Sequence, residues 1–369
     1  MPKIKAAVAY EFGKPLQVED VILRSPINNE VEVTLGAVAI CHSDISYMEG
    51  AWGGFLPAVY GHEASGKISN IGDNVEGLAI GDRVVVTLIR SCGNCTNCKQ
   101  GQPTICMTEY DGTNGPLKTS RGGTLMQAMA CGAFAEKVVV DKSQIVKVSS
   151  KISYEAAALM ACGVITGIGA VVNAAKIKPG QDVIIIGAGG VGLNAIQGAR
   201  LAGARRIIAV DLSEEKLNIA IEFGATDGIL GTKGSPWKLA KEKLGGGADA
   251  VFVSVGAVAV YDTAPLYLAQ GGQVVMLGMT KTNELATFKP VNLAAASQKL
   301  VGSKMGDTVI ERDIPWIADL YLQNRLKLDE LISKKWKLDQ INEAIFDTKS
   351  GSAKRNLIVF NHGISDAYN

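Results

Sequence analysis

The sequence lacks an excess of charge of either sign. Its 37 lysine and arginine residues balance 36 aspartate and glutamate residues, which leaves a formal net charge of +1. Proteins that bind nucleic acids or anionic membranes usually carry a basic surface, so this balance indicates neither kind of partner. The sequence also lacks internal repeats and low-complexity runs. With 47% hydrophobic and 20% charged residues over 369 positions, it is typical of a globular enzyme of about two domains.

A secretory signal is also missing from the N-terminal pattern. The first apolar run is too short for one and is followed at once by Glu11 and Lys14, so we expect a cytoplasmic protein. One uncharged stretch, residues 156–175, is long enough to cross a membrane. Its Ala- and Gly-rich composition, with polar residues such as Thr166 and Asn173 inside it, favours buried helices split by a glycine turn.

The seven cysteines form an odd set, which argues against a disulfide framework in a chain without a secretory signal. Four of them lie close together in the pattern Cys92-x2-Cys95-x2-Cys98-x7-Cys106. Four thiolates complete the tetrahedral shell of zinc, so this pattern predicts a structural zinc that stabilises a loop with little core. An iron–sulfur cluster and a zinc-ribbon nucleic-acid module are the alternatives. Cys131 belongs to no cluster, and we expect it to be a buried small residue.

Two patterns divide the chain. The first part, to about residue 150, alternates apolar and polar residues as β-strands do, for example over Val31–Leu35. From about Tyr154, Ala-rich helical stretches alternate with short apolar strands, which predicts a doubly wound parallel sheet of the α/β class. The clearest strands are Val183–Ile186, Ile207–Val210, Ala250–Val253 and Gln273–Leu277, and the clearest helices are Gly192–Ala202 and Glu214–Phe223.

The last part of the chain contains a helix near Pro315–Gln323 and a strand at Asn356–Phe360. We expect both to pack against the first, β-rich domain. The residues that follow, Asn361–Asn369, have the composition of a loose tail.

A glycine-rich turn follows the first strand of the α/β part. The run Gly187-Ala188-Gly189-Gly190-Val191-Gly192 lies between that strand and a helix, and Asp211 ends the next strand about 20 residues on. Gly187 permits a tight turn, Gly189 lets the backbone approach a pyrophosphate at the helix N-terminus, and Gly192 lets the helix pack closely. The arrangement predicts a dinucleotide site of the Rossmann type.

Asp211 also indicates which dinucleotide binds. Its carboxylate can accept hydrogen bonds from the adenosine ribose hydroxyls, and it would repel the 2′-phosphate of NADP. The following residues, Leu212 and Ser213, offer no arginine to that phosphate. We therefore expect NAD. Lys216, one turn into the next helix, either neutralises Asp211 or contacts the ribose; its alternative is a solvated surface lysine.

Three further short motifs carry possible metal ligands: Cys41-His42-Ser43-Asp44, Gly61-His62-Glu63 and Ala161-Cys162-Gly163. With the four-cysteine pattern and the glycine-rich turn in this order, the chain resembles a zinc-dependent alcohol dehydrogenase of the medium-chain dehydrogenase/reductase superfamily, in its longer, class III-like form. The resemblance covers roughly residues 5–360. It implies a GroES-like catalytic domain, residues 1–164 and 305–369, and a NAD-binding Rossmann domain, residues 165–304.

The resemblance implies a catalytic zinc held by Cys41, His62 and Cys162, with water or substrate in the fourth position, and therefore two zinc ions per chain. It places Asp44 on the far ring nitrogen of His62, which would fix the tautomer and orientation of the imidazole. It also places Glu63 beside the metal.

Further roles are implied around the substrate and the cofactor. Ser43 matches the hydroxyl that binds the substrate oxygen and begins proton removal, and Trp52 and Leu88 match an apolar pocket near the zinc. His42 and Arg355 match contacts to the cofactor pyrophosphate, with a surface position as the alternative for both.

The implied reaction is the reversible oxidation of an alcohol to an aldehyde or ketone, in which a zinc-bound alkoxide passes hydride to C4 of NAD. Many relatives pass the proton onward through a histidine five residues after the first zinc cysteine. Ser46 occupies that position here. Either Ser46 and a water replace the histidine, or the proton leaves through the cofactor ribose directly.

Oxidation of S-hydroxymethylglutathione is the alternative within the same family. The segment Gly50–Phe55 contains no acid, and Tyr110 stands where that group tends to carry arginine, so both features argue against it. A zinc-stabilised nucleotide-binding protein without catalysis is the alternative outside enzymes. Besides a small-molecule alcohol or aldehyde, we expect only a second copy of the chain as partner. The resemblance implies a homodimer or homotetramer joined at the edge of the nucleotide-domain sheet, with Gln273–Met279 contributing.

Overall fold

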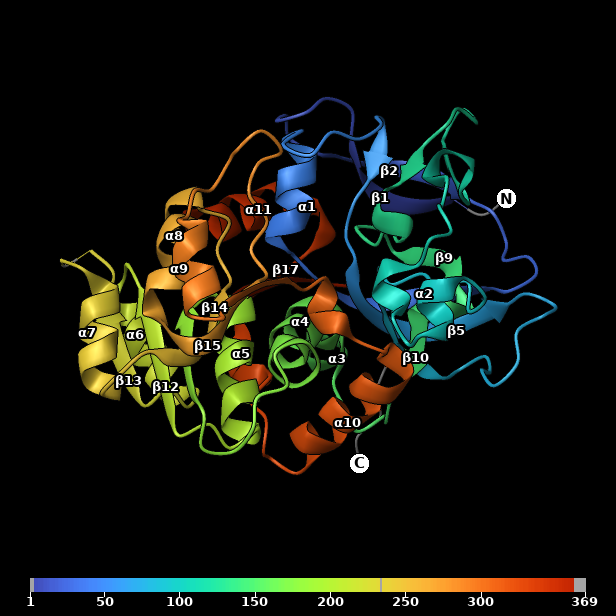
Figure 1. Ribbon diagram of the computed structural model, residues 1–369. Helices are drawn as coiled ribbons and strands as arrows, with labels where there is room; N and C mark the ends of the chain where they lie inside the picture. Colours follow the sequence, from blue (N-terminus) through green and yellow to red (C-terminus); the bar gives the residue numbers. More distant parts are fainter. Residues whose placement is uncertain (1–2, 233, 362–369) are drawn as a thin grey trace. The chain divides into compact units, whose positions relative to one another are not determined.

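The computed structural model describes residues 3–232 and 234–361 (Figure 1). It divides into two compact units: unit 1 comprises Met1–Cys162 and Val309–Asn369, and unit 2 comprises Gly163–Thr308. The chain therefore crosses from one unit to the other twice. The domain boundaries expected from the sequence were 164/165 and 304/305. Of the tail expected at Asn361–Asn369, only Asn361 belongs to the described residues.

Unit 1 contains two mostly antiparallel sheets. The smaller has the strand order β7-β2-β1-β4-β8, with β1 (Lys3–Ala9), β2 (Gln17–Leu23), β4 (Ala58–Val59), β7 (Leu117–Thr119) and β8 (Met126–Gln127). The larger has the order β10-β6-β5-β3-β18-β17, and β9 also pairs with β3. Its strands are β3 (Glu30–Ala39), β5 (Glu63–Ile71), β6 (Arg83–Val86), β9 (Lys137–Asp141), β10 (Ile145–Lys147), β17 (Ile332–Trp336) and β18 (Arg355–Val359). Val33, Leu35 and Phe134 are among the fully buried core residues of this unit.

Strand β18 brings the last part of the chain into the larger sheet. It pairs antiparallel with β3, with Leu357 opposite Ala39. At the end of β3 the backbone N–H of Ile40 donates to the carbonyl of Asn356 at 2.9 Å. The residues that follow β3 and those that begin β18 therefore lie close together.

The helices of unit 1 are α1 (His42–Met48), α2 (Thr96–Lys99), α3 (Tyr154–Leu159), α10 (Ile310–Leu322) and α11 (Ile341–Ser350). The helix expected near Pro315–Gln323 begins earlier, at Ile310, and contains Pro315 within it. The Asp313 carboxylate accepts the N–H of Val309 at 3.1 Å, so the first turn is closed by its own side chain. One face of the helix is buried and holds it in place despite the proline.

Unit 2 contains one parallel sheet with the strand order β13-β12-β11-β14-β15-β16. The strands are β11 (Asp182–Ile186), β12 (Arg206–Asp211), β13 (Asp227–Leu230), β14 (Ala248–Val253), β15 (Leu268–Met276) and β16 (Lys299–Gly302). Each neighbouring pair runs parallel. The central strands are almost wholly apolar because helices cover the sheet, as its purely parallel pairing requires. The predicted α/β class and Rossmann sheet are confirmed.

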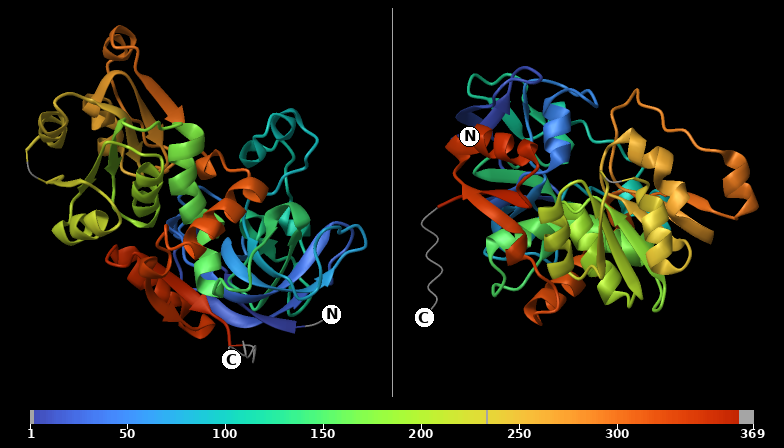
Figure 2. Two further views of the ribbon diagram at one scale, coloured as in Figure 1. Left: turned by 90° about the horizontal axis from the view of Figure 1, so that it is seen from below. Right: turned by 90° about the vertical axis from the view of Figure 1, so that its left-hand side faces the viewer.

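The helices of unit 2 are α4 (Ile165–Gly169), α5 (Gly190–Leu201), α6 (Glu214–Glu222), α7 (Pro236–Leu244), α8 (Val258–Thr263) and α9 (Pro290–Ala295). Figure 2 shows the strands of this sheet side by side with helices packed against them. The strand order reverses between β11 and β14, so right-handed crossovers place the helices of the first half of the sheet on one face and those of the second half on the other. In such sheets the carboxyl ends of the strands at the reversal form the ligand-binding crevice.

The edge of this sheet differs from the one expected. Gln273–Met279 was expected to contribute to an exposed edge, but β15 lies between β14 and β16, with Gln273 opposite Lys299. The edge strand on this side of the sheet is β16, and β13 forms the other edge. Strand β16 was missed because it is short and its segment has no clear alternation of apolar and polar residues.

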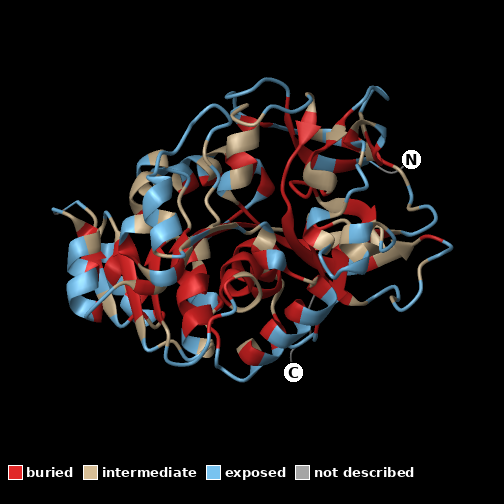
Figure 3. Ribbon diagram, viewed as in Figure 1, coloured by how far each residue is buried: buried red, intermediate tan, exposed pale blue. Residues whose placement is uncertain are grey.

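The uncharged stretch at 156–175 also differs from expectation. Tyr154–Ala174 forms one continuous helical run, in which α3 and α4 are joined by a π-helical turn at Met160–Val164, and a second π-helical turn follows at Ala170–Ala174. It is the one helix among residues 3–232 and 234–361 that is long and apolar enough to cross a membrane, and 89% of its apolar window is buried (Figure 3). The predicted glycine turn is wrong. A Cβ on Gly167 would lie 2.4 Å from the carbonyl oxygen of Val191 in α5, so this glycine permits close helix packing.

Candidate active site and metal centres

Four possible metal ligands converge in unit 1. Their donor atoms, on Cys41, His62, Glu63 and Cys162, all lie within 4.8 Å of one another. Cys41 follows β3 and caps the start of α1, while His62 precedes β5. Because β3 and β5 pair antiparallel with Ala39 opposite Glu63, the two residues are brought together at one end of the strand pair. The sequence placed these side chains together only through the family resemblance.

Cys162 reaches the cluster from a different element. It lies in the π-helical turn Met160–Val164 and is buried, with 6% of its surface exposed. A π-turn widens the helix by one residue and redirects the side chains that it carries. Cys162 is also the last residue of the first segment of unit 1, so the chain enters unit 2 directly after this cysteine.

Asp44 fixes the orientation of the His62 ring. Its side chain has no exposed surface, and Oδ1 lies 3.0 Å from Nδ1 of His62 and accepts the N–H of Gly61 at 2.9 Å. Oδ2 accepts the N–H of Cys41 at 3.2 Å. Burial disfavours the charged imidazole, but the Asp44 carboxylate and the Cys41 thiol outweigh it and raise the pKa of His62. A proton on Nδ1 directed at Asp44 leaves the lone pair of Nε2 for a metal.

Ser43 lies beside the same cluster. Its hydroxyl donates to Sγ of Cys41 at 3.0 Å and lies 3.4 Å from Nε2 of His62. A group at the open coordination position of a metal held by these ligands would therefore lie within reach of the Ser43 hydroxyl.

Glu63 has a partner that the sequence did not reveal. Arg355, at the start of β18, hydrogen-bonds its carboxylate through Nη2, and both side chains are buried. Burial raises the pKa of Glu63 to about 7, against the opposing effect of the guanidinium. Oε1 of Glu63 and Nε of Arg355 have no hydrogen-bond partner among the described residues. The structure thus gives Arg355 a buried carboxylate as its partner instead of a surface position; its contact with a pyrophosphate stays a prediction.

The donor set fits zinc. Two thiols and a neutral imidazole are ligands that zinc prefers, and a tetrahedral zinc separates two thiolate ligands by about 3.8 Å. The observed spread of donor atoms needs only a small contraction to reach this geometry. The unpartnered Oε1 of the buried Glu63 carboxylate, within the same spread of atoms, also favours a cation at this place.

The four-cysteine lobe forms the second cluster of donors. The Sγ atoms of Cys92, Cys95, Cys98 and Cys106 lie within 4.8 Å of one another, and all four residues are half-exposed. The N–H groups of Asn94 and Cys95 donate to Sγ of Cys92 at 3.4 and 3.3 Å. A hydrogen bond from the Thr108 side chain, together with these two bonds, lowers the pKa of Cys92 to about 6. Burial and the Cys95 thiol raise the pKa of Cys98 to about 12, so the thiolate, the form that binds zinc, is stabilised at Cys92 and disfavoured at Cys98.

The glycine-rich turn of unit 2 has the geometry of a phosphate-binding loop. Gly187 has φ +97°, and a Cβ on Gly192 would lie 1.8 Å from the carbonyl oxygen of Gly187. Only glycine fits at these two positions. Gly189 is different, because no atom lies within 4 Å of a Cβ built there. The space in front of Gly189, at the N-terminus of α5, is free for a ligand phosphate.

Asp211 ends β12 beside this turn. Its Oδ2 accepts the N–H of Ala188 at 2.7 Å, and its Oδ1 accepts the N–H of Ser213 at 3.1 Å. The carboxylate is thus fixed at the turn, half-buried, where the predicted ribose would lie. Lys216 lies in the first turn of α6 and is half-buried, and within the described part of the chain its ammonium group forms no ion pair with Asp211.

Known proteins share this fold. The family model described as alcohol dehydrogenase GroES-like domain matches residues 27–150, and the one described as zinc-binding dehydrogenase matches residues 190–322. An NDMA-dependent alcohol dehydrogenase of Amycolatopsis methanolica is 34% identical, over 97% of this chain and 99% of its own length. The chain belongs to the zinc-dependent alcohol dehydrogenases of the medium-chain dehydrogenase/reductase superfamily. It is therefore an enzyme.

Two further relatives are informative about this alcohol dehydrogenase. The crystal structure of benzyl alcohol dehydrogenase from Acinetobacter calcoaceticus superposes with a TM-score of 0.91, at 31% identity, over 98% of this chain and 100% of that one. An S-(hydroxymethyl)glutathione dehydrogenase of Synechocystis is 33% identical over 96% of this chain and 99% of its own length.

The other predicted site residues of the alcohol dehydrogenase occupy varied positions. His42 is exposed at the start of α1, and Ser46 is half-buried on the same helix. Trp52 is half-buried and packs edge-on against Tyr47, with ring centroids 5.0 Å apart. Leu88 is half-buried on the segment after β6. Their predicted roles at the pyrophosphate, in the relay and in the pocket stay predictions.

Cys131 is fully buried, as predicted, and belongs to neither cluster of ligands. Burial raises the pKa of its thiol, so the group stays protonated and inert at neutral pH.

Proposed function

We propose that this enzyme oxidises small alcohols to aldehydes or ketones with NAD, reversibly, with zinc at the Cys41–His62–Cys162 cluster. The observation that carries the proposal is the convergence of these three donors within 4.8 Å, with the Ser43 hydroxyl 3.0 Å from Cys41. Zinc held there would supply a Lewis acid that lowers the pKa of a coordinated alcohol. The four-cysteine lobe would hold a second, structural zinc.

The chain's own residues prepare the proton transfer. Asp44 holds His62 in one orientation, and Ser43 takes the proton from the substrate hydroxyl that binds beside it. Ser46 occupies the relay position on the next turn of α1, where a histidine stands in many relatives, and it passes the proton on through water.

NAD as the cofactor is supported by Asp211. Its carboxylate stands at the end of β12 and is fixed by two backbone N–H groups, so a 2′-phosphate would meet a negative charge there. Leu212, the next residue, is exposed and carries no compensating charge.

Oxidation of S-hydroxymethylglutathione is the second candidate, favoured by the Synechocystis relative. The surroundings of Tyr110 argue against it. The Tyr110 hydroxyl donates to the buried Gln127, and Arg90 stacks over its ring while pairing with Asp141. The Tyr110 side chain is uncharged, and the Arg90 guanidinium is already paired with Asp141 within unit 1. Neither residue therefore offers an unpaired positive charge to the carboxylates of a glutathione adduct.

The assembly is also a proposal. We propose a homodimer or homotetramer joined at the edge of the unit 2 sheet, which β16 presents. Four apolar residues between β15 and β16 are exposed by 46–85%, a state that favours burial against a second copy: Met279, Leu285, Phe288 and Val291. Light scattering of the purified enzyme measures the oligomeric state.

We also propose a cytoplasmic location. The half-exposed thiols of the lobe favour a reducing compartment, which supports a cytoplasmic enzyme that acts on small molecules.

The function is tested by following NAD reduction with primary, secondary, aromatic and polyol alcohols on zinc-loaded enzyme, repeated with NADP. Formaldehyde with and without glutathione separates the second candidate. Cys162→Ser, which removes one ligand, is expected to abolish turnover. An enzyme with two zinc ions per chain that reduces neither cofactor with any of these alcohols would contradict the proposal.

A further inference from the structure

The segment Thr87–Arg90 joins strand β6 to the four-cysteine lobe. Within it, Oγ1 of Thr87 accepts the N–H of Ile89 at 3.0 Å, and the carbonyl of Leu88 accepts the N–H of Arg90 at 2.9 Å. The second bond spans only two residues and defines a tight γ-type turn with Leu88 at its start. The conformation of this turn decides where the Leu88 side chain lies.

The β6 end of the segment is fixed by Gln144. This side chain has no exposed surface, and its amide donates to the carbonyls of Thr87 at 2.8 Å and Ala130 at 2.9 Å. The N–H of Thr87 donates in turn to the carbonyl of Gln144 at 3.0 Å. Thr87 is thus held through both of its backbone polar groups.

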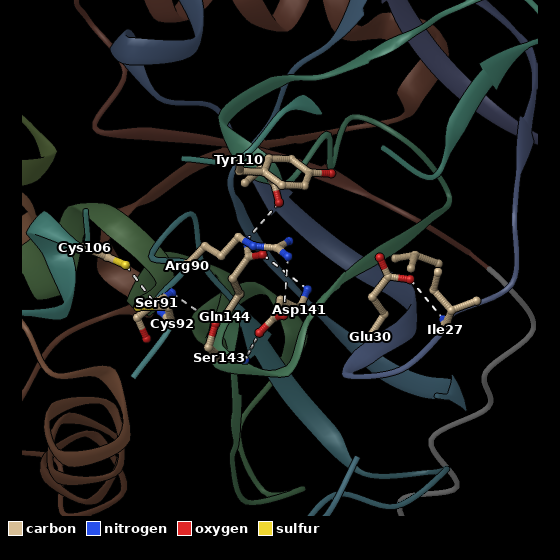
Figure 4. A network of polar contacts seen from close by, with 12 residues as sticks. Ile27, Glu30, Arg90, Ser91, Cys92, Cys106, Tyr110, Asp141, Ser143 and Gln144 are labelled. Atoms are coloured by element: carbon tan, nitrogen blue, oxygen red, sulfur yellow. Dashed lines mark hydrogen bonds and ion pairs between the residues drawn. The ribbon is translucent and has the colours of Figure 1, made fainter. Parts of the chain in front are cut away.

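The lobe end of the segment is fixed by the side chain of Arg90 (Figure 4). Its guanidinium carbon lies 4.4 Å from the centre of the Tyr110 ring, and Nη2 lies 3.5 Å from the carboxylate of Asp141. The next N–H, of Ser91, donates to Oγ of Ser143 at 3.1 Å, and the N–H of Ser143 donates to Asp141 at 2.9 Å. We call Arg90, Ser91, Tyr110, Asp141 and Ser143 the clamp.

Tyr110 gives the clamp a rigid support. Its hydroxyl donates to Gln127, which is 1% exposed and whose amide donates to the carbonyls of Cys131 and Val139 at 3.0 and 2.9 Å. Burial raises the pKa of Tyr110 to about 12, so the phenol keeps its proton. Arg90 and Asp141 also line a groove of about 880 Å³ beside the lobe. The ion pair is therefore partly solvated, and the ring and the backbone contacts hold Arg90 more firmly than the charge pair does.

We propose that Arg90 is a positioning residue for substrate selection: through the clamp it fixes the Thr87–Arg90 turn and with it Leu88 in the alcohol pocket. This inference rests on the proposed function and on the place in the alcohol pocket that the family resemblance implies for Leu88. The simpler role of the clamp is to attach the four-cysteine lobe to the strands, and the two roles give different results.

Arg90→Gln removes the stacked guanidinium. We expect amide hydrogen exchange in the peptide containing residues 87–91 to become about tenfold faster. The ratio of kcat/KM for a short primary alcohol over a branched secondary alcohol should change by about tenfold, through KM, while kcat for the best substrate stays within about twofold. Zinc content should remain two ions per chain. Tyr110→Phe, which keeps the ring and loses the hydroxyl, should change both quantities in the same direction by less.

Arg206→Gln is the matched control. Arg206 is also half-buried and pairs with a carboxylate, that of Asp227, at 3.0 Å, but both residues belong to unit 2 and the clamp belongs to unit 1. It should leave the exchange and the substrate ratio unchanged. Unchanged exchange in Arg90→Gln, or faster exchange with an unchanged ratio, would overturn the proposal, and so would loss of the lobe zinc alone. If the wild-type enzyme oxidises no alcohol, the proposed function fails, and the exchange result still decides whether Arg90 holds the turn.

Discussion

At the scale of single residues, the site depends on groups that are buried and whose hydrogen bonds are nearly complete. Asp44 illustrates this, because its two oxygens serve a histidine ring and two backbone N–H groups without any contact with water. A buried carboxylate in such a position is stable only while its partners remain. Replacing one atom there should therefore affect the metal site more than the fold.

Asp44→Asn tests this directly. The amide keeps the size of the carboxylate but loses its charge, so it no longer enforces the proton on Nδ1 of His62. We expect the affinity of the Cys41–His62–Cys162 cluster for zinc to fall by about 10–100-fold. Competition with a metal chelator, followed by mass spectrometry of the bound zinc, measures it. Retention of wild-type affinity would remove the orienting role of Asp44.

Asp227, at the start of β13, is a test of pH dependence. Burial disfavours its charged form, but hydrogen bonds from Thr226, Lys243 and Arg206 outweigh burial and lower its pKa. The ionised group therefore stabilises the fold above the ordinary aspartate pKa, about 4, and this contribution is lost as the pH falls through the lowered value.

Asp227→Asn should accordingly cost about 1 kcal/mol of unfolding free energy at pH 7, because the partner cations are half-exposed. The difference from the wild-type protein should shrink as the pH is lowered below about 4. Urea unfolding at pH 7, 5 and 3.5 gives the comparison. A difference that grew towards low pH would contradict the assigned direction of the pKa.

At the scale of elements, the functional groups lie on short irregular segments, and the regular strands and helices next to these segments fix their positions. The π-helical turn Met160–Val164 presents Cys162, the cap of α1 presents Cys41, and the turn before α5 presents backbone N–H groups. Sequence patterns predicted the four central strands of unit 2, β11, β12, β14 and β15, because each contains an apolar run, but not the short edge strands β13 and β16. They missed the π-turn, because its composition equals that of an ordinary apolar helix.

The glycine-rich turn offers a matched pair of substitutions. Gly189 has an extended backbone and open space at its Cβ position, so Gly189→Ala should leave the melting temperature unchanged but fill the phosphate space. We expect the Kd for NAD to rise at least about tenfold, as for loss of a good hydrogen-bonded contact. Isothermal titration calorimetry measures it.

Gly192→Ala should act in the opposite way. Its Cβ would collide with the carbonyl of Gly187, so the loss is expected first in stability, by about 1–3 kcal/mol. An equal loss of NAD affinity with full stability in both variants would contradict the distinct roles of the two glycines.

At the scale of the whole molecule, the family resemblance predicted more than local patterns could. Cys41, His62 and Cys162 lie far apart in sequence, and no spacing rule joins them. The local pattern of Cys92–Cys106 was sufficient on its own, because those ligands share one loop. The ion pair of Arg355 with Glu63 could not be predicted, because it depends on the register of β18 against β3.

The two metal clusters should respond differently to the loss of a ligand. Cys98→Ser removes a ligand of the half-exposed lobe, which has little core, so we expect about one zinc per chain and a melting temperature lower by roughly 5 °C. Cys162→Ser should also retain about one zinc but lose turnover with a smaller thermal effect. Metal analysis together with calorimetry separates the two. Equal thermal shifts would contradict a structural role for the lobe.

The pairing of β18 with β3 has a consequence for how the polypeptide matures during translation. Unit 2 is one uninterrupted stretch, and the carbonyl of Ile165 near its start accepts the hydroxyl of Thr308 at its end at 3.4 Å, so it can fold as soon as it has left the ribosome. Unit 1 cannot complete its fold at that stage, because β3 pairs with β18, which is synthesised close to the end of the chain. Until β18 has been made, the Ala37–Ala39 end of β3 is an unpaired strand edge, which can mispair with other strands, whereas Glu30–Thr34 already pairs with β9.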